Sequence, residues 1–151
     1  SGFAKEYIEE NGEDASSTST FGFIWNNYGY NLSDELYVAQ RNVICELADK
    51  GNCVIVGRCS NYILEQADID SFDVFIKADI EKRAENVADR VELKGDELIK
   101  FLQRRDHKRR VYYRFYTRRK WGDYHDYNMM LDSGMIGKDK CVDMIISAIG
   151  E

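Results

Sequence analysis

The sequence predicts an α/β domain built on a parallel sheet, and three observations lead to this fold class. Short apolar runs at residues 52–57 (NCVIVG), 71–78 (SFDVFIKA) and 127–132 (YNMMLD) have the composition of strands. Helical patterns separate and follow these runs, and strands that alternate with helices favour a parallel sheet with right-handed crossovers. The run at 52–57 has no polar alternation, which predicts a strand buried on both faces. Ligands of such sheets bind beyond the carboxyl ends of the strands.

The first third of the chain is predicted to contain two helices joined by irregular segments. We expect a short helix at 3–10, a polar loop at 13–20, and at 21–30 an aromatic segment that either packs in the core or walls a binding cleft. A longer helix follows, with Ser33 as its N-cap and Gly51 directly after its end. The apolar face predicted for this helix consists of Leu36, Ala39, Val43 and Leu47.

Three further helices are predicted between and after the strands. Ser60 is suited to cap a short helix through Gln66, and Asp79 a longer one through Leu93. The last helix is expected at 138–149. Its predicted apolar face consists of Val142, Ile145, Ile146 and Ile149.

The stretch from Asp96 to Trp121 begins as an amphipathic helix and becomes strongly basic. Residues 104–120 hold nine of the 21 basic residues and one of the 27 acidic residues, so this segment carries a net charge of +8 on a remainder of −14. Like-charged neighbours one helical turn apart cost roughly 0.2–0.5 kcal/mol each, and a bound anion would offset that repulsion. Guanidinium groups present paired donors that fit phosphate oxygens. We therefore predict a local polyphosphate site.

Several classes of protein are disfavoured by the composition. The four cysteines, Cys45, Cys53, Cys59 and Cys141, have no metal-binding spacing and are predicted to be reduced thiols of a cytoplasmic protein. No apolar run approaches the roughly 18 residues that a membrane span requires, and no signal peptide is recognisable. We expect no metal site formed by the chain itself and no membrane partner.

Four segments, in this order and spacing, resemble the cytidylate kinase-like group of nucleoside monophosphate kinases. They are VIVGRCSNYIL, FIKADIEKRAENVADR, RRDHKRRVYYRFYTRRKWGD and YNMMLDSGMIG. The resemblance runs from about Leu36 to the C-terminus. It implies a three-layer nucleotide-kinase fold, like that of P-loop NTPases, in a single domain over residues 1–151. The basic helix at 96–121 would be the lid of that domain.

The resemblance implies catalytic and substrate-binding roles for particular basic residues. Arg58, at the end of a Gly-Arg strand, would bind the phosphate of the nucleoside monophosphate. Arg105 and Arg109, in an Arg-Asp-x-x-Arg pattern, would clamp the phosphoryl group during transfer. Asp106 would hold the arginines in place, since it can reach Arg109 and Arg110 at i+3 and i+4.

The resemblance also implies contacts beyond this central group. Arg114 and Arg118 would face phosphate from the later part of the basic helix. Asp132 and Ser133 follow the last strand, in a loop that lies near the ATP base in the family. Asp132 is equally suited to cap a helix or turn.

The implied reaction is transfer of the γ-phosphoryl group of Mg-ATP to CMP or dCMP, but the sequence departs from the family in one respect. It contains no glycine-rich GxxxxGK[ST] loop, the motif that cradles the ATP phosphates. We therefore expect the chain to lack the family's first strand, loop and first helix, to bind the monophosphate weakly and to turn over little. The missing strand would lie between 52–57 and 71–78, so these strands should either pair directly or recruit another chain, for example as a homo-oligomer.

Two alternatives remain open from the residues alone. The basic helix could grip a nucleic-acid backbone while Tyr112, Tyr113 and Tyr116 stack on bases, although the acidic remainder disfavours extended binding. The chain could also be a non-catalytic nucleotide-binding regulator, or a kinase of the same fold that acts on another small acceptor.

Overall fold

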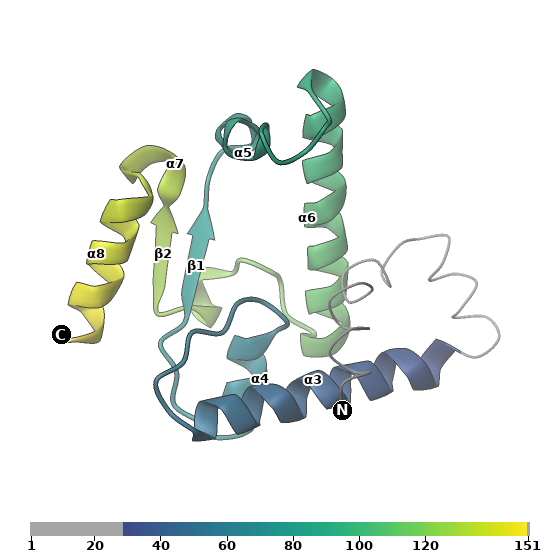
Figure 1. Ribbon diagram of the computed structural model, residues 1–151. Helices are drawn as coiled ribbons and strands as arrows, with labels where there is room; N and C mark the ends of the chain where they lie inside the picture. Colours follow the sequence, from purple (N-terminus) through teal and green to yellow (C-terminus); the bar gives the residue numbers. More distant parts are fainter. Residues whose placement is uncertain (1–28, 151) are drawn as a thin grey trace. The chain divides into compact units, whose positions relative to one another are not determined.

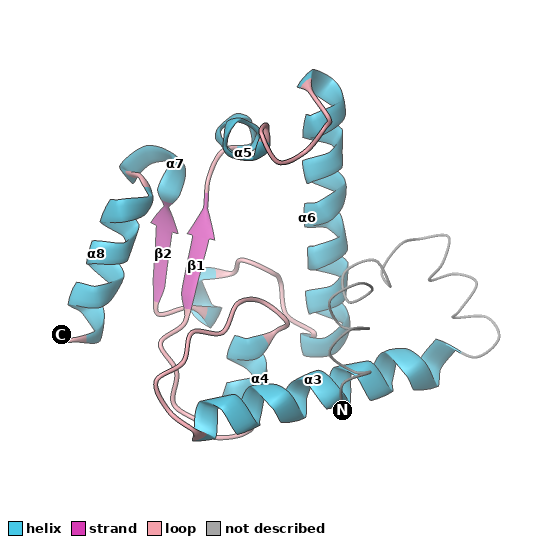
Figure 2. Cartoon of the chain, viewed as in Figure 1, coloured by secondary structure: helices cyan, strands magenta, loops and turns pink. Residues whose placement is uncertain are grey.

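The computed structural model of the chain describes residues 29–150, and helices predominate in it (Figures 1 and 2). In chain order its elements are α3 (Gly29–Asp49), α4 (Ser60–Gln66), β1 (Val74–Lys77), α5 (Ile80–Val87), α6 (Gly95–Thr117), the 3-10 helix η2 (Tyr124–Asp126), β2 (Met129–Asp132), α7 (Ser133–Ile136) and α8 (Lys138–Ile149). The segments predicted at 3–10 and 13–20, and most of 21–30, lie outside the described residues. No helix in the described part of the chain is long and apolar enough to cross a bilayer.

The chain divides into two compact units. Of the described residues, unit 1 comprises 29–71 together with Lys108–Trp121, and unit 2 comprises Phe72–His107 together with 122–150. Helix α6 therefore contributes its first half to unit 2 and its second half to unit 1.

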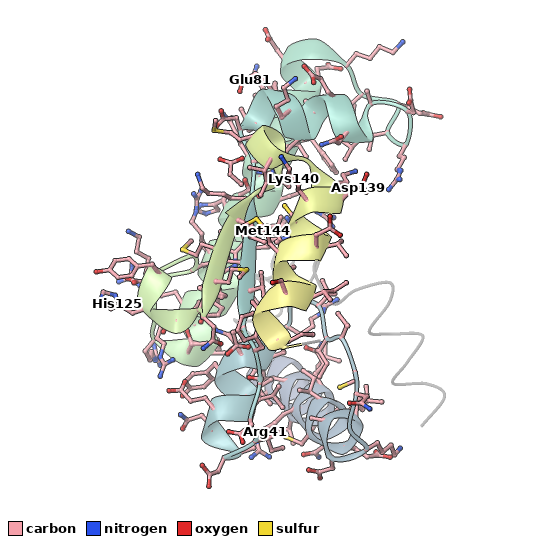
Figure 3. The ribbon with its side chains drawn as sticks, turned by 90° about the vertical axis from the view of Figure 1, so that its left-hand side faces the viewer. Arg41, Glu81, His125, Asp139, Lys140 and Met144 are labelled. Atoms are coloured by element: carbon pink, nitrogen blue, oxygen red, sulfur yellow. The ribbon has the colours of Figure 1, made fainter. Side chains whose placement is uncertain are left out.

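Unit 2 is built around a parallel pair of strands, as the sequence predicted. β1 pairs with β2 in the register that joins Val74 to Met129 and Lys77 to Asp132. At the start of the pair, the Asn128 side chain accepts a hydrogen bond of 2.7 Å from the backbone N–H of Asp73. Helix α8 runs alongside the sheet (Figure 1), and Met144 lies on this helix (Figure 3). Helix α8 has the predicted bounds.

The prediction of a strand at 52–57 is wrong. These residues form no strand, and the side chains of Val54 and Val56 are 94% and 85% exposed. Ile55 points the other way and packs against the core of unit 1. A strand buried on both faces needs neighbours, and the described residues hold one sheet of two strands, β1 and β2. The predicted direct pairing of 52–57 with 71–78 is therefore also wrong.

The core of unit 1 forms where α3 meets α4. Ile44 of α3 packs with Ile63 and Leu64 of α4, and the partly buried residues around them are Tyr37, Cys45, Ala48, Ile55 and Ile69. The predicted apolar face of α3 was wrong by about one position, because Val43 and Leu47 are exposed whereas Gln40 and Ile44 are buried. The side chains that α4 and α6 present decide which face of α3 is covered. α3 also begins at Gly29, before the predicted cap at Ser33.

Candidate functional site

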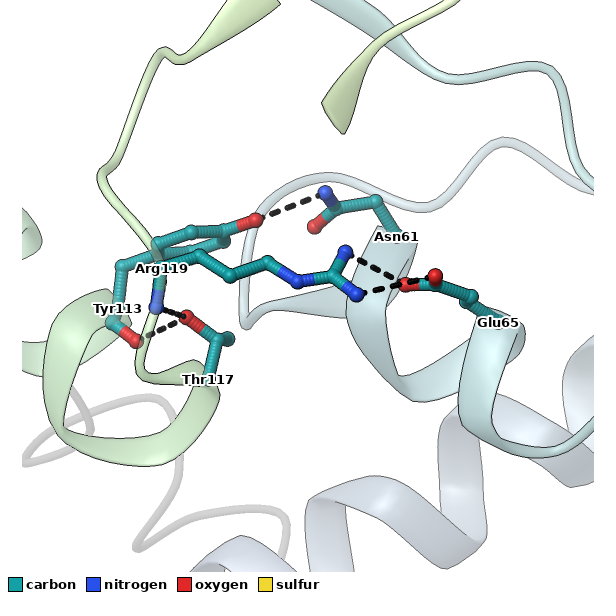
Figure 4. Close-up of polar contacts among 5 residues, drawn as sticks. All are labelled: Asn61, Glu65, Tyr113, Thr117 and Arg119. Atoms are coloured by element: carbon teal, nitrogen blue, oxygen red, sulfur yellow. Dashed lines mark hydrogen bonds and ion pairs between the residues drawn. The ribbon is translucent and has the colours of Figure 1, made fainter. Parts of the chain in front are cut away.

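Helix α6 carries most of the basic stretch and ends in a well-defined turn. The hydroxyl of Thr117 donates to the carbonyl of Tyr113 at 2.7 Å and accepts from the backbone N–H of Arg119 at 3.0 Å (Figure 4). Arg118 has a left-handed backbone with φ of 61°. This turn ends the helix, and the Arg118 guanidinium lies over the Phe115 ring at 5.9 Å.

The second half of α6 docks in unit 1 through its tyrosines. Asn61 donates to the Tyr113 hydroxyl at 3.0 Å, and Arg119 donates to both carboxylate oxygens of Glu65 at 2.6 and 3.0 Å (Figure 4). The Tyr116 ring stacks on Tyr37 with centroids 4.0 Å apart and planes 4° apart. Tyr113 is only 4% exposed. Tyr113 therefore cannot stack on a nucleic-acid base, as the alternative function would require, because its ring is already covered.

Arg58 lies in a strained turn that leads into α4. Gly57, Arg58 and Cys59 have consecutive positive φ angles of 73°, 57° and 57°. Such a backbone costs roughly 1–2 kcal/mol for each residue other than glycine. The turn is closed by the backbone N–H of Ser60, which donates to the carbonyl of Gly57 at 3.0 Å. Strain of this kind persists where the surrounding structure holds it, often at a functional site.

Two ionisable groups that interact with Arg58, the Cys59 thiol and the Tyr112 hydroxyl, are neutral at physiological pH. Burial raises the pKa of the Cys59 thiol to about 12, against a smaller opposing effect of Arg58. Burial likewise raises the pKa of Tyr112, which Arg58 also opposes. Among the described residues Arg58 forms no ion pair. Its charge is therefore uncompensated by those neighbours.

The remaining predicted residues of unit 1 lie in the second half of α6 and in the turn directly after it. Arg109, Arg114 and Arg118 are all exposed. Arg114 makes no ion pair within the described residues. Exposed guanidinium groups on the same unit as Arg58 provide the donors that a phosphate would require.

In unit 2, the structure gives Asp106 a partner that the sequence reasoning missed. Arg83 of α5 donates to the two carboxylate oxygens of Asp106 at 2.6 and 2.8 Å, and these bonds raise the pKa of Arg83. The pair ties α5 to the first half of α6. The separation of 23 residues left no local spacing from which to predict it. Beside it on α6, the Arg105 guanidinium lies over the Phe101 ring at 5.8 Å.

Asp132 and Ser133 lie at the end of β2, also in unit 2. Asp132 caps α7 by accepting from the backbone N–H groups of Gly134 and Met135 at 3.1 and 3.2 Å. It also pairs with Lys77 at 2.9 Å, and the hydrogen bond from Lys77 is the main reason that the pKa of Asp132 is lowered. Ser133 donates to the carbonyl of Lys77 at 3.2 Å. The capping role that the sequence left open for Asp132 is thus confirmed.

Two other features bear on ligand binding. A hollow of about 420 Å³ opens on α3, but its lining includes the carboxylates of Asp34 and Glu35, which repel phosphate. In the part of the chain that the structure describes, no three His, Cys, Asp or Glu side chains group as cation ligands. A Mg²⁺ ion would fit best if it arrived on the phosphates of a nucleotide, since Mg²⁺ is commonly held by one or two carboxylates and substrate phosphates.

Comparison with known proteins identifies the family. The chain is similar to an uncharacterized protein from Eubacterium ventriosum ATCC 27560 of known crystal structure, with 30% sequence identity and a TM-score of 0.70 over 78% of this chain and 74% of that one. The comparison with curated proteins found no match. A family model described as the cytidylate kinase-like family matches residues 1–135. That match includes the strained Arg58 turn and the basic helix α6, and it shows that the chain belongs to the cytidylate kinase-like family.

Proposed function

We propose that the chain is a nucleoside monophosphate kinase-like phosphotransferase, whose reaction moves the γ-phosphoryl group of Mg-ATP to CMP or dCMP in a P-loop-NTPase-like fold. Its family indicates a nucleotide-kinase-like function with nucleotide substrates. The observation that supports transfer to a nucleoside monophosphate is the environment of Arg58. Its guanidinium has no ion-pair partner in the described residues and lies beside neutral groups, on the unit that also exposes Arg109, Arg114 and Arg118.

The proposed roles follow from the charges. Arg58 binds the phosphate of the monophosphate with paired N–H donors. Arg105, Arg109, Arg114 and Arg118 neutralise the charge on the oxygens of the phosphoryl group while it moves between the two nucleotides. The Mg²⁺ ion, when bound, supplies further neutralisation of the phosphates.

Asp106 has a positioning role in this proposal. Its bonds with Arg83 fix the carboxylate on α6, one residue after Arg105. A fixed carboxylate limits the orientations of the arginines around it. The conformational entropy of these side chains is then lost during folding rather than when the substrate binds. The basic helix predicted over residues 96–121 ends at Thr117, and we assign this segment the part of a lid that closes on the bound nucleotides. Asp132 and Ser133 are proposed to lie near the ATP base.

The proposal is tested by calorimetric titration of CMP, dCMP and cytidine into the full chain. We expect CMP to bind more tightly than cytidine, because only CMP carries a phosphate. Arg58→Met should weaken CMP binding roughly 10- to 100-fold, as expected for charged hydrogen bonds, and should leave cytidine unaffected. Lys50→Met is the matched control, because Lys50, directly after α3, is exposed and bonds to Glu46 of that helix. Equal affinities for CMP and cytidine would refute the proposal.

Turnover is a separate measurement. A coupled assay for ADP release, with CMP as acceptor, reports phosphoryl transfer. Because residues 1–151 contain no GxxxxGK[ST] loop, we expect little ADP release from this chain. Ordinary turnover rates would contradict the reasoning from the glycine-rich loop, while leaving the assignment of Arg58 intact.

A further inference from the structure

Gln40 is a buried polar residue with an unused hydrogen-bond donor. Its side chain is 5% exposed on the inner face of α3. The hydroxyl of Tyr112 donates to its Oε1 at 3.1 Å. Its Nε2 is fully buried and has no hydrogen-bond partner among the described residues.

An unpaired buried amide is rare because it loses its hydrogen bonds to water without replacement. Turning the amide by half a rotation would only exchange the two ends and leave Oε1 without a donor. A leucine would fill the same volume without any such loss. The residue is therefore better explained by a partner that joins it than by the folded state alone.

The surroundings of Gln40 indicate the chemistry of that partner. The Tyr112 and Tyr116 rings are tilted together with centroids 4.8 Å apart, and Tyr116 stacks on Tyr37. Arg58 is near enough to Tyr112 to influence its ionisation. An aromatic wall, an amide donor and an unpaired guanidinium match the flat ring, polar edge and phosphate of a nucleotide.

We propose that the Nε2 of Gln40 donates a hydrogen bond to the ring nitrogen N3 of cytosine and so selects CMP over UMP. This inference rests on the proposed function and adds the residue that reads the base. Cytosine N3 is an acceptor, whereas uracil carries an N–H at N3. With uracil, two hydrogen-bond donors, Nε2 of Gln40 and N3–H, would therefore face each other. Tyr112 is a positioning residue, because its hydroxyl occupies Oε1 and keeps Nε2 directed at the base.

Binding requires a rearrangement of what now covers the amide. Because Nε2 is buried in the free chain, the base must displace a covering side chain to reach it. Tyr112 is hydrogen-bonded to Gln40 and its ring packs against Tyr116, so binding of CMP should change the near-ultraviolet circular dichroism of tyrosine. Ribose 5-phosphate has no base and should leave that signal unchanged.

The experiment measures the affinities of CMP, UMP and ribose 5-phosphate for the full chain and two variants. Wild type should prefer CMP to UMP by about tenfold or more, the effect of one hydrogen bond. Gln40→Leu should weaken CMP binding by a similar factor and leave ribose 5-phosphate binding unchanged. Tyr112→Phe should lower the ratio of CMP to UMP affinity, because the amide can then rotate and accept from uracil.

Melting temperatures separate reading of the base from a purely structural role. The double variant Gln40→Leu, Tyr112→Phe replaces both members of the pair with apolar groups and should be at least as stable as wild type. If Gln40→Leu leaves the CMP affinity unchanged, or weakens the binding of CMP and ribose 5-phosphate equally, the role proposed for Gln40 is refuted. The role proposed for Arg58 is not affected by that result. If wild type binds none of the phosphate esters, the proposed function and this inference fall together.

Discussion

The ion pair between Arg83 and Asp106 should be a measurable part of the stability of the chain. Asp106→Asn removes the charge and one of the two acceptors that Arg83 now uses at 2.6 and 2.8 Å. Breaking a buried pair costs 3–5 kcal/mol, and a charged hydrogen bond contributes 1.5–3 kcal/mol. The two side chains are 28% and 16% exposed, so solvent screens part of this effect and we expect a loss of about 2 kcal/mol. The melting temperature should fall by about 4–8 °C.

The assay is thermal and urea unfolding followed by circular dichroism. Glu85→Gln is the matched control, because it breaks the exposed pair between Lys82 and Glu85 on the same helix α5. An exposed pair contributes little, and we expect a change below about 0.5 kcal/mol in this control. A double-mutant cycle with Arg83→Met and Asp106→Asn isolates the interaction, and its coupling energy should exceed about 1 kcal/mol.

Two results would refute this reasoning. The first is a loss of stability in Asp106→Asn no larger than that in Glu85→Gln. The second is a coupling energy near zero in the cycle with Arg83→Met. Either would mean that solvent screens the pair as fully as a surface contact, so that it could not fix the position of Asp106 on α6.

Three further changes test other features of the chain. Arg118→Gly should stabilise the chain by about 1 kcal/mol in urea unfolding, because glycine adopts the left-handed backbone without strain; a loss of stability would show that the stacking on Phe115 outweighs the strain. Val54→Lys should leave stability unchanged, since the side chain is 94% exposed, and should reduce any self-association seen by light scattering; a wild-type mass of 17.6 kDa would contradict recruitment of a second chain. Asp132 has a lowered pKa, so its contribution to stability is complete above the unfolded pKa near 3.9 and is lost as the pH falls below it. Asp132→Asn should therefore flatten the acid side of the stability profile, and an unchanged profile would contradict this assignment.

Local signals predicted the parts of the fold that depend on local chemistry. The apolar runs at 71–78 and 127–132 predicted strands of a parallel sheet, and β1 and β2 form a parallel pair within these runs. Gly51 was predicted to follow the end of a helix, and its backbone φ of 77° is the left-handed conformation that such a position favours. The bounds predicted for α8 are confirmed, whereas the N-cap of α4 is Cys59 rather than Ser60, and α5 ends at Val87 rather than at the predicted Leu93.

Features that depend on a neighbour could not be predicted. Residues 52–57 have the composition of a buried strand, but a strand forms only where another strand accepts its hydrogen bonds. The apolar face predicted for α8 was wrong in the same sense, because Val142 and Ile146 are exposed and Cys141 is buried. Periodicity identifies a helix, whereas the packing of other elements decides which of its faces is covered.

The candidate site illustrates the same limit. Arg58 and the arginines of α6 could be selected because their residue types and order carry a recognisable pattern. Gln40 and Arg83 could not, because each matters through a partner that is distant in the sequence. Their importance lies in hydrogen bonds that no local spacing encodes.

The segment at 52–56 also gives the chain a chemical reporter of its own. Cys53 is exposed beside Val54, whereas Cys45 is partly buried and Cys59 and Cys141 are buried. The thiolate form reacts with alkylating reagents, and the pKa of about 12 at Cys59 keeps that thiol protonated. Any strand that pairs with this segment would shield Cys53, so the rate at which Cys53 itself is alkylated measures how often the segment is covered.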